Sequence, residues 1–308
     1  MKIAVLMGGK SSEAEVSRKS GNAIAKALQQ IEHEVTELEW NEADVIRNIE
    51  ELYRYDVIFI AYHGGAGEDG KVQAVLQLAG IPFTGSRYVA SGIAMNKVLS
   101  KMLFENEGIP TPPWIETKPD IDNSSLLLSI VQNGFSLPAV VKPISEGSTV
   151  GVTIAVSEKE LLDGVELASK HGEVMVEQYI PGKEVTVSIL EGIALPVIEI
   201  IPEDGFYDYE HKYTAGKSRY VCPAGIPGQI AEKLQRYAVG AYKAIGCRHY
   251  ARVDFRINEA NDIFCLEVNT LPGMTGLSLV PMAAKAIGIE FPELVNKIAC
   301  ITYESKEE

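Results

Sequence analysis

The sequence contains few cysteines, few histidines and no long hydrophobic run. Its four cysteines show no Cys-x-x-Cys spacing, and its five histidines do not follow a zinc-ligand pattern. A chain of 308 residues buries a core large enough to need no disulfides, so we expect reduced thiols and a cytoplasmic location. No window approaches the ~18 to 20 apolar residues that cross a bilayer. The first residues, Lys2–Leu6, read directly into a strand and not into a secretory signal.

Positive charge is also scarce. Lys and Arg total 28 against 42 Asp and Glu, which gives a net charge of −14 at pH 7. A surface this acidic repels nucleic acid and anionic lipid, so we expect neither DNA, RNA nor a membrane as a partner. The hydrophobic and charged fractions, 46% and 23%, are ordinary for a globular protein. The length suggests two or three domains.

The first 85 residues alternate between strand and helix patterns. Lys2–Met7 and Asp56–Ala61 are short apolar runs typical of buried parallel strands. Glu13–Gln30 has helical periodicity, and Asn41–Tyr53 is a plausible helix. This alternation predicts an α/β domain over residues 1–85 with a parallel sheet covered on both faces.

The rest of the chain divides at about residue 180. Residues 86–180 combine helical segments, Tyr88–Glu107 and Ser157–His171 among them, with several short strands, and Ser157 with Glu160 forms a capping box. Residues 181–308 are rich in strands, including Ala194–Ile201. The long loop 203–224 interrupts them, and loops of this length are often functional lids.

Two features follow strands of the first domain. Gly65-x-Gly67-x-x-Gly70 matches a dinucleotide fingerprint, but Glu68 and Asp69 would place negative charge where a pyrophosphate binds, so we interpret it as a turn with Asp69 capping a helix. His63 lies at a strand end, where parallel sheets bind ligands, and a binding and a structural role are equally open. Glu15, after Gly8-Gly9, is of interest only if the ligand is cationic, for example an ammonium group.

Residues 142–151 suggest an anion site. Lys142 ends an apolar strand, where an unpaired charge is costly to bury, so it indicates an anionic partner. The following loop of small residues, 145–151, resembles a mobile flap whose backbone N–H groups can surround a phosphate. A plain hairpin with an exposed lysine is the alternative.

The most informative pattern lies near the C-terminus. Arg252 and Asp254 share one face of a strand, and Glu267 and Asn269 share one face of the next. A turn at Asn258–Asp262 predicts a hairpin over strands Tyr250–Ile257 and Ile263–Asn269. Its register places Asp254 opposite Glu267 and Arg252 opposite Asn269, within a residue or two. Two carboxylates and an amide oxygen on one surface suit Mg²⁺, and without a cation the carboxylates would repel each other. The alternative is a surface ladder of salt bridges, which fits poorly with the apolar flanks.

Together these motifs resemble the D-alanine–D-alanine ligases of the ATP-grasp superfamily over nearly the whole chain. The resemblance is carried by the order and spacing of the motifs, which are Gly8-Gly9 with Glu15-Val16-Ser17, His63-Gly64, Met95-Asn96-Lys97, Lys142-Pro143, Glu146-Gly147-Ser148, Lys212-Tyr213, Arg252-Val253-Asp254, Glu267-Val268-Asn269 and Ser278-Leu279-Val280-Pro281.

The resemblance implies a mixed α/β, three-domain ATP-grasp enzyme whose N-terminal domain holds the parallel sheet. Such an enzyme joins two D-alanines, bound in two subsites, through an acyl phosphate, and it uses ATP and two Mg²⁺ or Mn²⁺ ions. It serves peptidoglycan synthesis in the cytoplasm, and we expect a homodimer.

The resemblance also implies roles for individual residues. Nucleotide contacts fall to Lys97 and Lys142 at the phosphates, to Glu177 and the Ile180 backbone at the adenine, to Glu184 at the ribose, and to Lys212. Metal binding falls to Asp254, Glu267 and Asn269. At the substrates, the resemblance implies that Glu15 holds the first ammonium in a triad with Ser148 and Tyr213, and that His63 lies near the first D-alanine. Lys212 and Ser278 are expected to bind the carboxylate of the second D-alanine. Arg252 and the Gly273 N–H are expected to stabilise the oxyanion.

Three alternatives remain open from the sequence. A sister ligase could take D-serine or D-lactate as its second substrate, although Tyr213 argues against D-lactate. A non-catalytic ATP-binding module on the same fold has no need for oxyanion donors such as Arg252 and Gly273. A Rossmann oxidoreductase would bind a nicotinamide cofactor.

Overall fold

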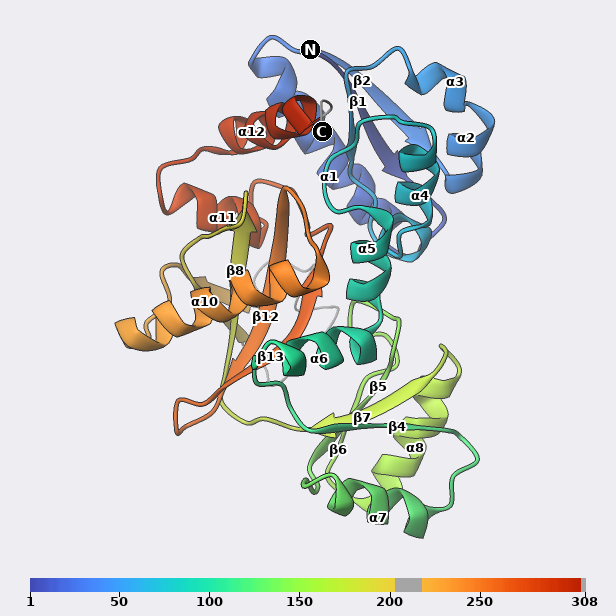
Figure 1. The fold of residues 1–308 in the computed structure, drawn as a ribbon, viewed down its shortest axis with the longest axis vertical. Coiled ribbons are helices and arrows are strands. Elements are labelled where there is room, and N and C mark those ends of the chain that lie inside the picture. Colours follow the sequence, from blue (N-terminus) through green and yellow to red (C-terminus); the bar gives the residue numbers. More distant parts are fainter. Residues whose placement is uncertain (203–217, 306–308) are drawn as a thin grey trace.

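The structure, a computed structural model, describes residues 1–202 and 218–305. Within these residues the strands form three sheets, of three, six and four strands. Figure 1 shows the three-stranded sheet at the top, the six-stranded sheet in the middle and the four-stranded sheet at the bottom. No described helix combines the length and the apolar character that crossing a bilayer demands.

The three-stranded sheet is parallel, as predicted, with the order β2-β1-β3. The central strand, β1, is buried at every residue after Lys2 because helices cover both faces. Helix α1 packs on this sheet, and helix α12, near the end of the chain, returns to pack against α1 and β3. The elements of this part are β1 (Lys2–Gly8), α1 (Ala14–Gln30), β2 (Glu34–Trp40), α2 (Glu42–Arg47), α3 (Ile49–Leu52), β3 (Val57–Ile60), a 3₁₀ turn (Gly65–Gly67), α4 (Lys71–Leu78) and α12 (Phe291–Glu304).

Helix α4 begins after Gly70 and not at an Asp69 cap. Gly70 has φ +93°, and a Cβ there would lie 2.4 Å from the Tyr88 carbonyl oxygen, so only glycine fits. The Asp69 side chain instead accepts a hydrogen bond from the Lys71 N–H at 3.1 Å. The expectation that Asp69 caps the helix was therefore wrong by one residue, although Asp69 does bind the first turn.

The helix expected over Tyr88–Glu107 is two helices, α5 (Tyr88–Met95) and α6 (Lys97–Asn106). Asn96 interrupts them because it adopts an extended conformation and its side chain caps α6, accepting a hydrogen bond from the Leu99 N–H at 3.0 Å. The Lys97 N–H donates to the Ile144 carbonyl at 3.1 Å. The break thus fixes Lys97 in the first turn of α6, beside the four-stranded sheet.

The four-stranded sheet is antiparallel, with the order β4-β7-β5-β6. Strands β5 and β6 form a hairpin whose connection is the Gly/Ser loop 145–151. Lys142 lies on β5 and Glu177 on the adjacent strand β7. The elements are β4 (Trp114–Thr117), α7 (Asn123–Gln132), β5 (Ala139–Pro143), β6 (Thr153–Ala155), α8 (Glu158–Ser169) and β7 (Val174–Gln178).

The six-stranded sheet has the order β11-β10-β8-β12-β13, with β9 also paired to β8. Strands β12 and β13 have the predicted bounds, whereas the strand expected over Ala194–Ile201 is split into β9 and β10. Helix α11 was not predicted. The elements are β8 (Lys183–Leu190), β9 (Ile193–Ala194), β10 (Ile198–Pro202), β11 (Ser218–Val221), α10 (Gly228–Ile245), β12 (Tyr250–Ile257), β13 (Ile263–Asn269) and α11 (Leu279–Lys285).

The predicted N-cap of α8, Ser157, is confirmed by its side-chain hydrogen bond. The Ser157 hydroxyl accepts a hydrogen bond from the Glu160 N–H at 3.3 Å, and the Glu160 carboxylate accepts from the Val156 N–H at 2.9 Å. Ser157→Ala should lower the unfolding free energy by about 1 kcal/mol, because it leaves the Glu160 N–H without its acceptor. Chemical denaturation followed by circular dichroism measures the change. Ser157→Asp, which retains an acceptor, should cost much less, and equal losses in the two variants would contradict the capping argument.

Candidate active site

The β12–β13 hairpin brings together the four polar residues that the sequence singled out. The pairing register sets Asp254 opposite Glu267 and Arg252 opposite Asn269, as predicted. A register shift after Asp254 changes the pairing of the residues that follow. The two carboxylates therefore face each other across neighbouring strands, where like charges repel unless a cation lies between or beside them.

Arg252 supplies part of that positive charge. Its Nε and Nη2 donate to the two oxygens of Asp254 at 2.9 and 2.8 Å. The Thr186 hydroxyl also donates to Asp254, at 2.6 Å. Glu267 is less enclosed, and the Lys97 ammonium lies 4.0 Å from its carboxylate. Arg252 thus holds Asp254 in place and lies within reach of whatever the two carboxylates bind.

The donor set of this hairpin suits a hard divalent cation. Among residues 1–202 and 218–305, no three His, Cys, Asp or Glu side chains form a metal-binding group. The hairpin instead offers two carboxylates and the amide of Asn269, whose oxygen accepts a hydrogen bond from the Leu271 N–H at 3.0 Å. Mg²⁺ is commonly held by one or two carboxylates plus water and substrate phosphates. The residues present therefore fit Mg²⁺ provided that a phosphate-bearing ligand completes its coordination.

A pocket for such a ligand lies between the four-stranded and six-stranded sheets. It is bordered by residues of β5 and β7 on one side and of β12 and β13 on the other. Its lining combines the ammonium groups of Lys97 and Lys142 with the two carboxylates of the hairpin, and the Lys97 ammonium lies 4.0 Å from Glu267. The predicted residues that line it are Lys97, Lys142, Ser148, Glu177, Ile180, Glu184, Asp254 and Glu267.

The floor of this pocket contains a buried ionic cluster. The Glu177 carboxylate binds the Lys142 ammonium through one oxygen and, at 2.8 Å, the Lys101 ammonium through the other. Burial opposes ionisation of Glu177, but the two lysines outweigh it and hold its pKa below the usual range. Glu177 was predicted to face an adenine, and in this structure its carboxylate faces the two lysines. Lys101 was missed, although it lies one turn from Lys97 on the same side of α6.

The loop 145–151 closes the pocket. The Lys97 ammonium donates to the Glu146 carbonyl, which ties the loop to α6. Ser148 and Thr149 have φ values of +50° and +65°, a region that costs non-glycine residues energy and is enriched at binding sites. The loop is therefore held in a conformation that its residues would not adopt freely.

Arg256 also lines the pocket, and the sequence motifs did not indicate it. Its guanidinium donates to the carbonyls of Ile180 and Gly182 at 3.1 and 3.0 Å and pairs with Glu184 at 3.3 Å. Arg256 shares one face of β12 with Arg252 and Asp254, so the same alternation that pointed to those residues could have found it.

The glutamate that contacts the loop is Glu13 and not Glu15. The Ser148 hydroxyl donates to the Glu13 carboxylate, which is buried. Glu15 lies on the solvent side of α1, where its exposed side chain pairs with Arg18 at 3.3 Å. The predicted contact between Glu15 and Ser148 was therefore wrong. Glu13 precedes the helix and points back across the sheet edge, whereas Glu15, two residues further on, points away.

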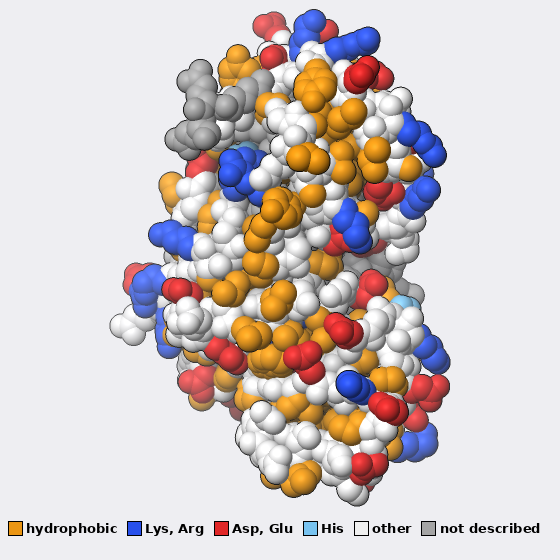
Figure 2. All heavy atoms as spheres, turned by 45° about the vertical axis from the view of Figure 1, so that its right-hand side comes forward, with side chains coloured by type: hydrophobic (Ala, Val, Ile, Leu, Met, Phe, Trp, Pro, Cys, Tyr) orange, Lys and Arg blue, Asp and Glu red, His pale blue; other side chains and the backbone are white. Residues whose placement is uncertain are grey.

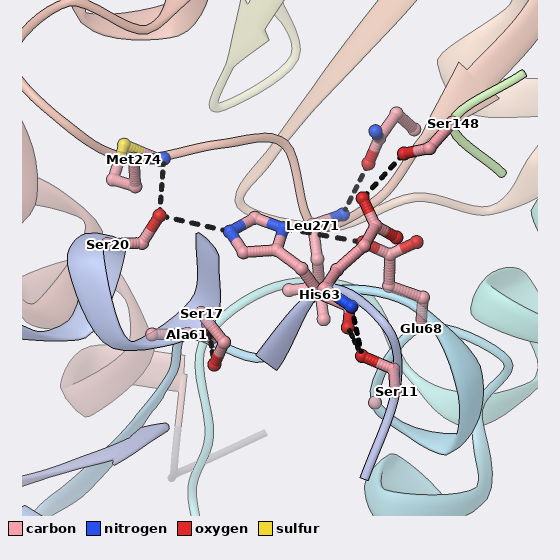
Figure 3. A network of polar contacts seen from close by, with 12 residues as sticks. Ser11, Ser17, Ser20, Ala61, His63, Glu68, Ser148, Leu271 and Met274 are labelled. Atoms are coloured by element: carbon pink, nitrogen blue, oxygen red, sulfur yellow. Dashed lines mark hydrogen bonds and ion pairs between the residues drawn. The ribbon is translucent and has the colours of Figure 1, made fainter. Parts of the chain in front are cut away.

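His63 lies beside this contact, at the edge of the parallel sheet (Figure 3). Its Nε2 contacts the Ser20 hydroxyl at 3.0 Å, and that hydroxyl accepts from the Met274 N–H at 3.4 Å. Its Nδ1 lies 3.5 Å from Glu68. His63 is thus buried in a polar network that joins the sheet edge to the loop after β13.

Gly273 and Ser278 belong to that same loop. A Cβ at Gly273 would lie 3.1 Å from the Ser278 hydroxyl oxygen, so the two residues approach closely. The Ser278 hydroxyl accepts a hydrogen bond from the Thr275 N–H at 3.0 Å, and Ser278 directly precedes α11. Lys212 and Tyr213 lie outside the described residues, as does most of the expected lid, 203–224.

Comparison with known proteins identifies relatives over the full chain. Family models for the N-terminus and C-terminus of D-ala D-ala ligase match residues 37–86 and 103–300. The D-alanine–D-alanine ligase of Syntrophotalea carbinolica is 46% identical over 305 residues, covering 96% of this chain and 94% of that protein. The crystal structure of the Bacillus anthracis D-alanine–D-alanine ligase complexed with ATP is 36% identical, with a TM-score of 0.86, and covers 100% of this chain and 99% of that one. The VanG D-Ala:D-Ser ligase from Enterococcus faecalis is 30% identical with a TM-score of 0.83, covering 98% and 99%.

The contact between Glu13 and Ser148 predicts a difference between two neighbouring glutamates. Glu13→Ala should accelerate amide hydrogen exchange over residues 146–150 several-fold, because the strained loop loses its tie to the parallel-sheet part. Glu15→Ala, which removes an exposed surface ion pair, should leave exchange in the loop unchanged. Mass-spectrometric hydrogen exchange measures both variants, and an equal effect of the two would contradict this placement.

Proposed function

Because the chain belongs to the D-alanine–D-alanine ligase family, we propose that it joins two molecules of D-alanine with conversion of ATP to ADP and phosphate. The product, D-alanyl-D-alanine, supplies peptidoglycan synthesis. The observation that supports this function best is that one pocket is lined both by two lysines and by the two carboxylates of the β12–β13 hairpin. A nucleotide with bound Mg²⁺ is the ligand that complements both sets of charges.

The proposed nucleotide contacts follow the walls of the pocket. Lys97 and Lys142 are the cations nearest to the phosphates, and the backbone of Ile180 and the side chain of Glu184 border the end suited to the base and ribose. Asp254, Glu267 and Asn269 hold the metal ions, which neutralise phosphate charge when bound. Positioning and charge neutralisation supply most of the catalysis in phosphoryl transfer.

The proposed D-alanine subsites lie where the parallel sheet meets the loop after β13. Glu13 replaces Glu15 as the partner of the first ammonium, since Glu13 is the acid that reaches Ser148, and His63 is its neighbour. The carboxylate of the first D-alanine accepts the γ-phosphoryl group of ATP, the amine of the second attacks that acyl phosphate, and phosphate leaves. Arg252 and the Gly273 N–H are the proposed donors to the oxyanion of this attack, and Ser278 with Lys212 binds the second carboxylate. Tyr213 completes the triad with Glu13 and Ser148.

We further propose the domain division 1–85, 86–180 and 181–308, a cytoplasmic location and a homodimer. The strands of the parallel, the four-stranded and the six-stranded sheets support this division. Helices α5 and α6 of the second segment pack against α10 and β13 of the third, and α12 packs back onto the first.

Exposed apolar side chains support the dimer, and Figure 2 shows hydrophobic side chains in a band down one face. On α4 and α5, Leu78 is 93% and Val89 52% exposed. A second copy of the chain is the occupant that we propose for this surface.

The reaction itself is tested by product analysis. Incubation with ATP, Mg²⁺ and D-alanine alone should yield D-alanyl-D-alanine and ADP in equal amounts, measured by mass spectrometry and nucleotide chromatography. Parallel incubations that add D-serine or D-lactate separate the sister ligases, and a predominant mixed product would overturn the choice of second substrate. ADP formation that does not depend on D-alanine would favour a nucleotide-binding module.

Glu267→Gln tests the metal assignment. It should lower kcat/KM by on the order of 100-fold or more, about 3 kcal/mol of transition-state stabilisation, because the variant retains the shape but loses the charge that binds Mg²⁺. The thermal unfolding temperature should change little, since Glu267 is partly exposed. Glu259→Gln, in the exposed β12–β13 turn, is a matched control. Unchanged turnover in Glu267→Gln would contradict the assignment.

Leu78→Asp tests the dimer surface. A buried carboxylate in the apolar contact should convert the dimer to a monomer at micromolar concentration, as measured by sedimentation velocity. Leu128→Asp, at an exposed leucine on α7, is the control and should remain dimeric. A wild-type chain that sediments as a monomer would refute the proposed dimer.

A further inference from the structure

Lys101 is a fully buried lysine that the proposed reaction leaves without a role. Its side chain has 0% exposure, and burying an ammonium group is costly unless it is paired and hydrogen-bonded. Its Nζ binds the Thr111 hydroxyl at 2.6 Å, the Pro112 carbonyl at 3.2 Å and the Glu177 carboxylate at 2.8 Å. The group is therefore fully engaged by the protein and does not line the nucleotide pocket itself.

The charges around Glu177 decide how much positive charge the pocket presents. Lys101 and Lys142 both pair with Glu177, so two positive charges and one negative charge give a cluster with a net charge of +1. Only Lys142 of the two lysines borders the pocket. Without Lys101, Glu177 and Lys142 would neutralise each other, and the net charge of the cluster would be zero.

Resting on the proposed function, we propose that Lys101 is a positioning residue for the nucleotide. Lys101 compensates the charge of Glu177 from a position that does not border the pocket. Lys142 therefore keeps its attraction for the phosphates, while its ion pair with Glu177 fixes the direction of the Lys142 ammonium group. Low-dielectric surroundings make this compensation stronger than the same arrangement in water. The lysine thereby acts on the ligand only through Glu177 and Lys142.

The position of Lys101 also couples the two sheets that border the pocket. The Thr111 hydroxyl that binds Lys101 donates to the Cys265 carbonyl on β13 at 2.8 Å, and the Cys265 N–H donates to the Pro110 carbonyl at 2.7 Å. Cys265 is two residues before Glu267. A purely structural role as a tie between the sheets is therefore the competing explanation, and the experiment must separate it from the role in charge.

Calorimetric titration with Mg-ADP and with adenosine separates the two roles. In Lys101→Met, the affinity for Mg-ADP should fall by on the order of tenfold or more, because a unit charge near the phosphates is lost, while the affinity for adenosine stays within about twofold. The double variant Lys101→Met/Glu177→Gln restores a net charge of +1, so most of the Mg-ADP affinity should return. Lys159→Met, at an exposed lysine paired with Asp163, should leave both affinities unchanged.

Equal losses of Mg-ADP and adenosine binding in Lys101→Met, or a double variant as weak as the single one, would overturn the inference in favour of a structural tie. If circular dichroism shows that Lys101→Met does not fold, the single variant Glu177→Gln is used as the test instead. That variant keeps an oxygen that can accept from Lys142 and raises the net charge of the cluster to +2, so it should bind Mg-ADP more tightly at low salt. Unchanged or weaker binding would overturn the inference. Failure of the wild-type chain to bind Mg-ADP would instead refute the proposed function.

Discussion

The antiparallel pairing of β12 with β13 is the constraint on which the rest of the site depends. Its register sets Asp254 opposite Glu267, and a slip of one residue would turn both side chains to the apolar face of the sheet. The arrangement is unfavourable by itself, since two carboxylates face each other. Arg252, Thr186 and Lys97 lessen that repulsion from the protein side, and the open side of the pair faces the pocket, where a cation-bound phosphate group is the natural complement.

Two further carboxylates of the pocket, Glu177 and Glu184, are each paired with basic side chains of the protein. Glu177 is ionised although it is buried, because Lys101 and Lys142 approach it from two sides. Arg256 plays a comparable part at the other end by pairing with Glu184 and fixing the backbone after β7. The site therefore presents preorganised charges that need little rearrangement to bind a ligand, which is the condition for strong electrostatic catalysis.

The sequence predicted those parts of the structure that local patterns determine. Strands β12 and β13 have the expected bounds because alternation and the turn at Asn258–Asp262 fix them, and the capped start of α8 was correct as well. The return of α12 to the first sheet and the break at Asn96 were missed. The first depends on packing between α12 and elements more than 200 positions earlier in the chain, and the second on a cap inside an otherwise continuous helical pattern.

The error at Glu15 has a similar cause. Glu13 and Glu15 are chemically identical in a local reading, and only the helix start at Ala14 separates a buried residue from an exposed one. Lys101 escaped notice because a lysine in a helix is usually solvated, and its burial appears only when β7 and β13 converge on α6. Patterns thus located the site, whereas the identity of the buried partners required the tertiary structure.

The central claim is that the β12–β13 carboxylates bind divalent cations together with a nucleotide. Electron paramagnetic resonance titration of Mn²⁺ in the presence of a non-hydrolysable ATP analogue tests it most directly. The account predicts Mn²⁺ bound to the wild-type chain with the analogue, and a large loss of that binding in Asp254→Asn with the protein still folded. Equal Mn²⁺ binding by the two proteins would contradict the account.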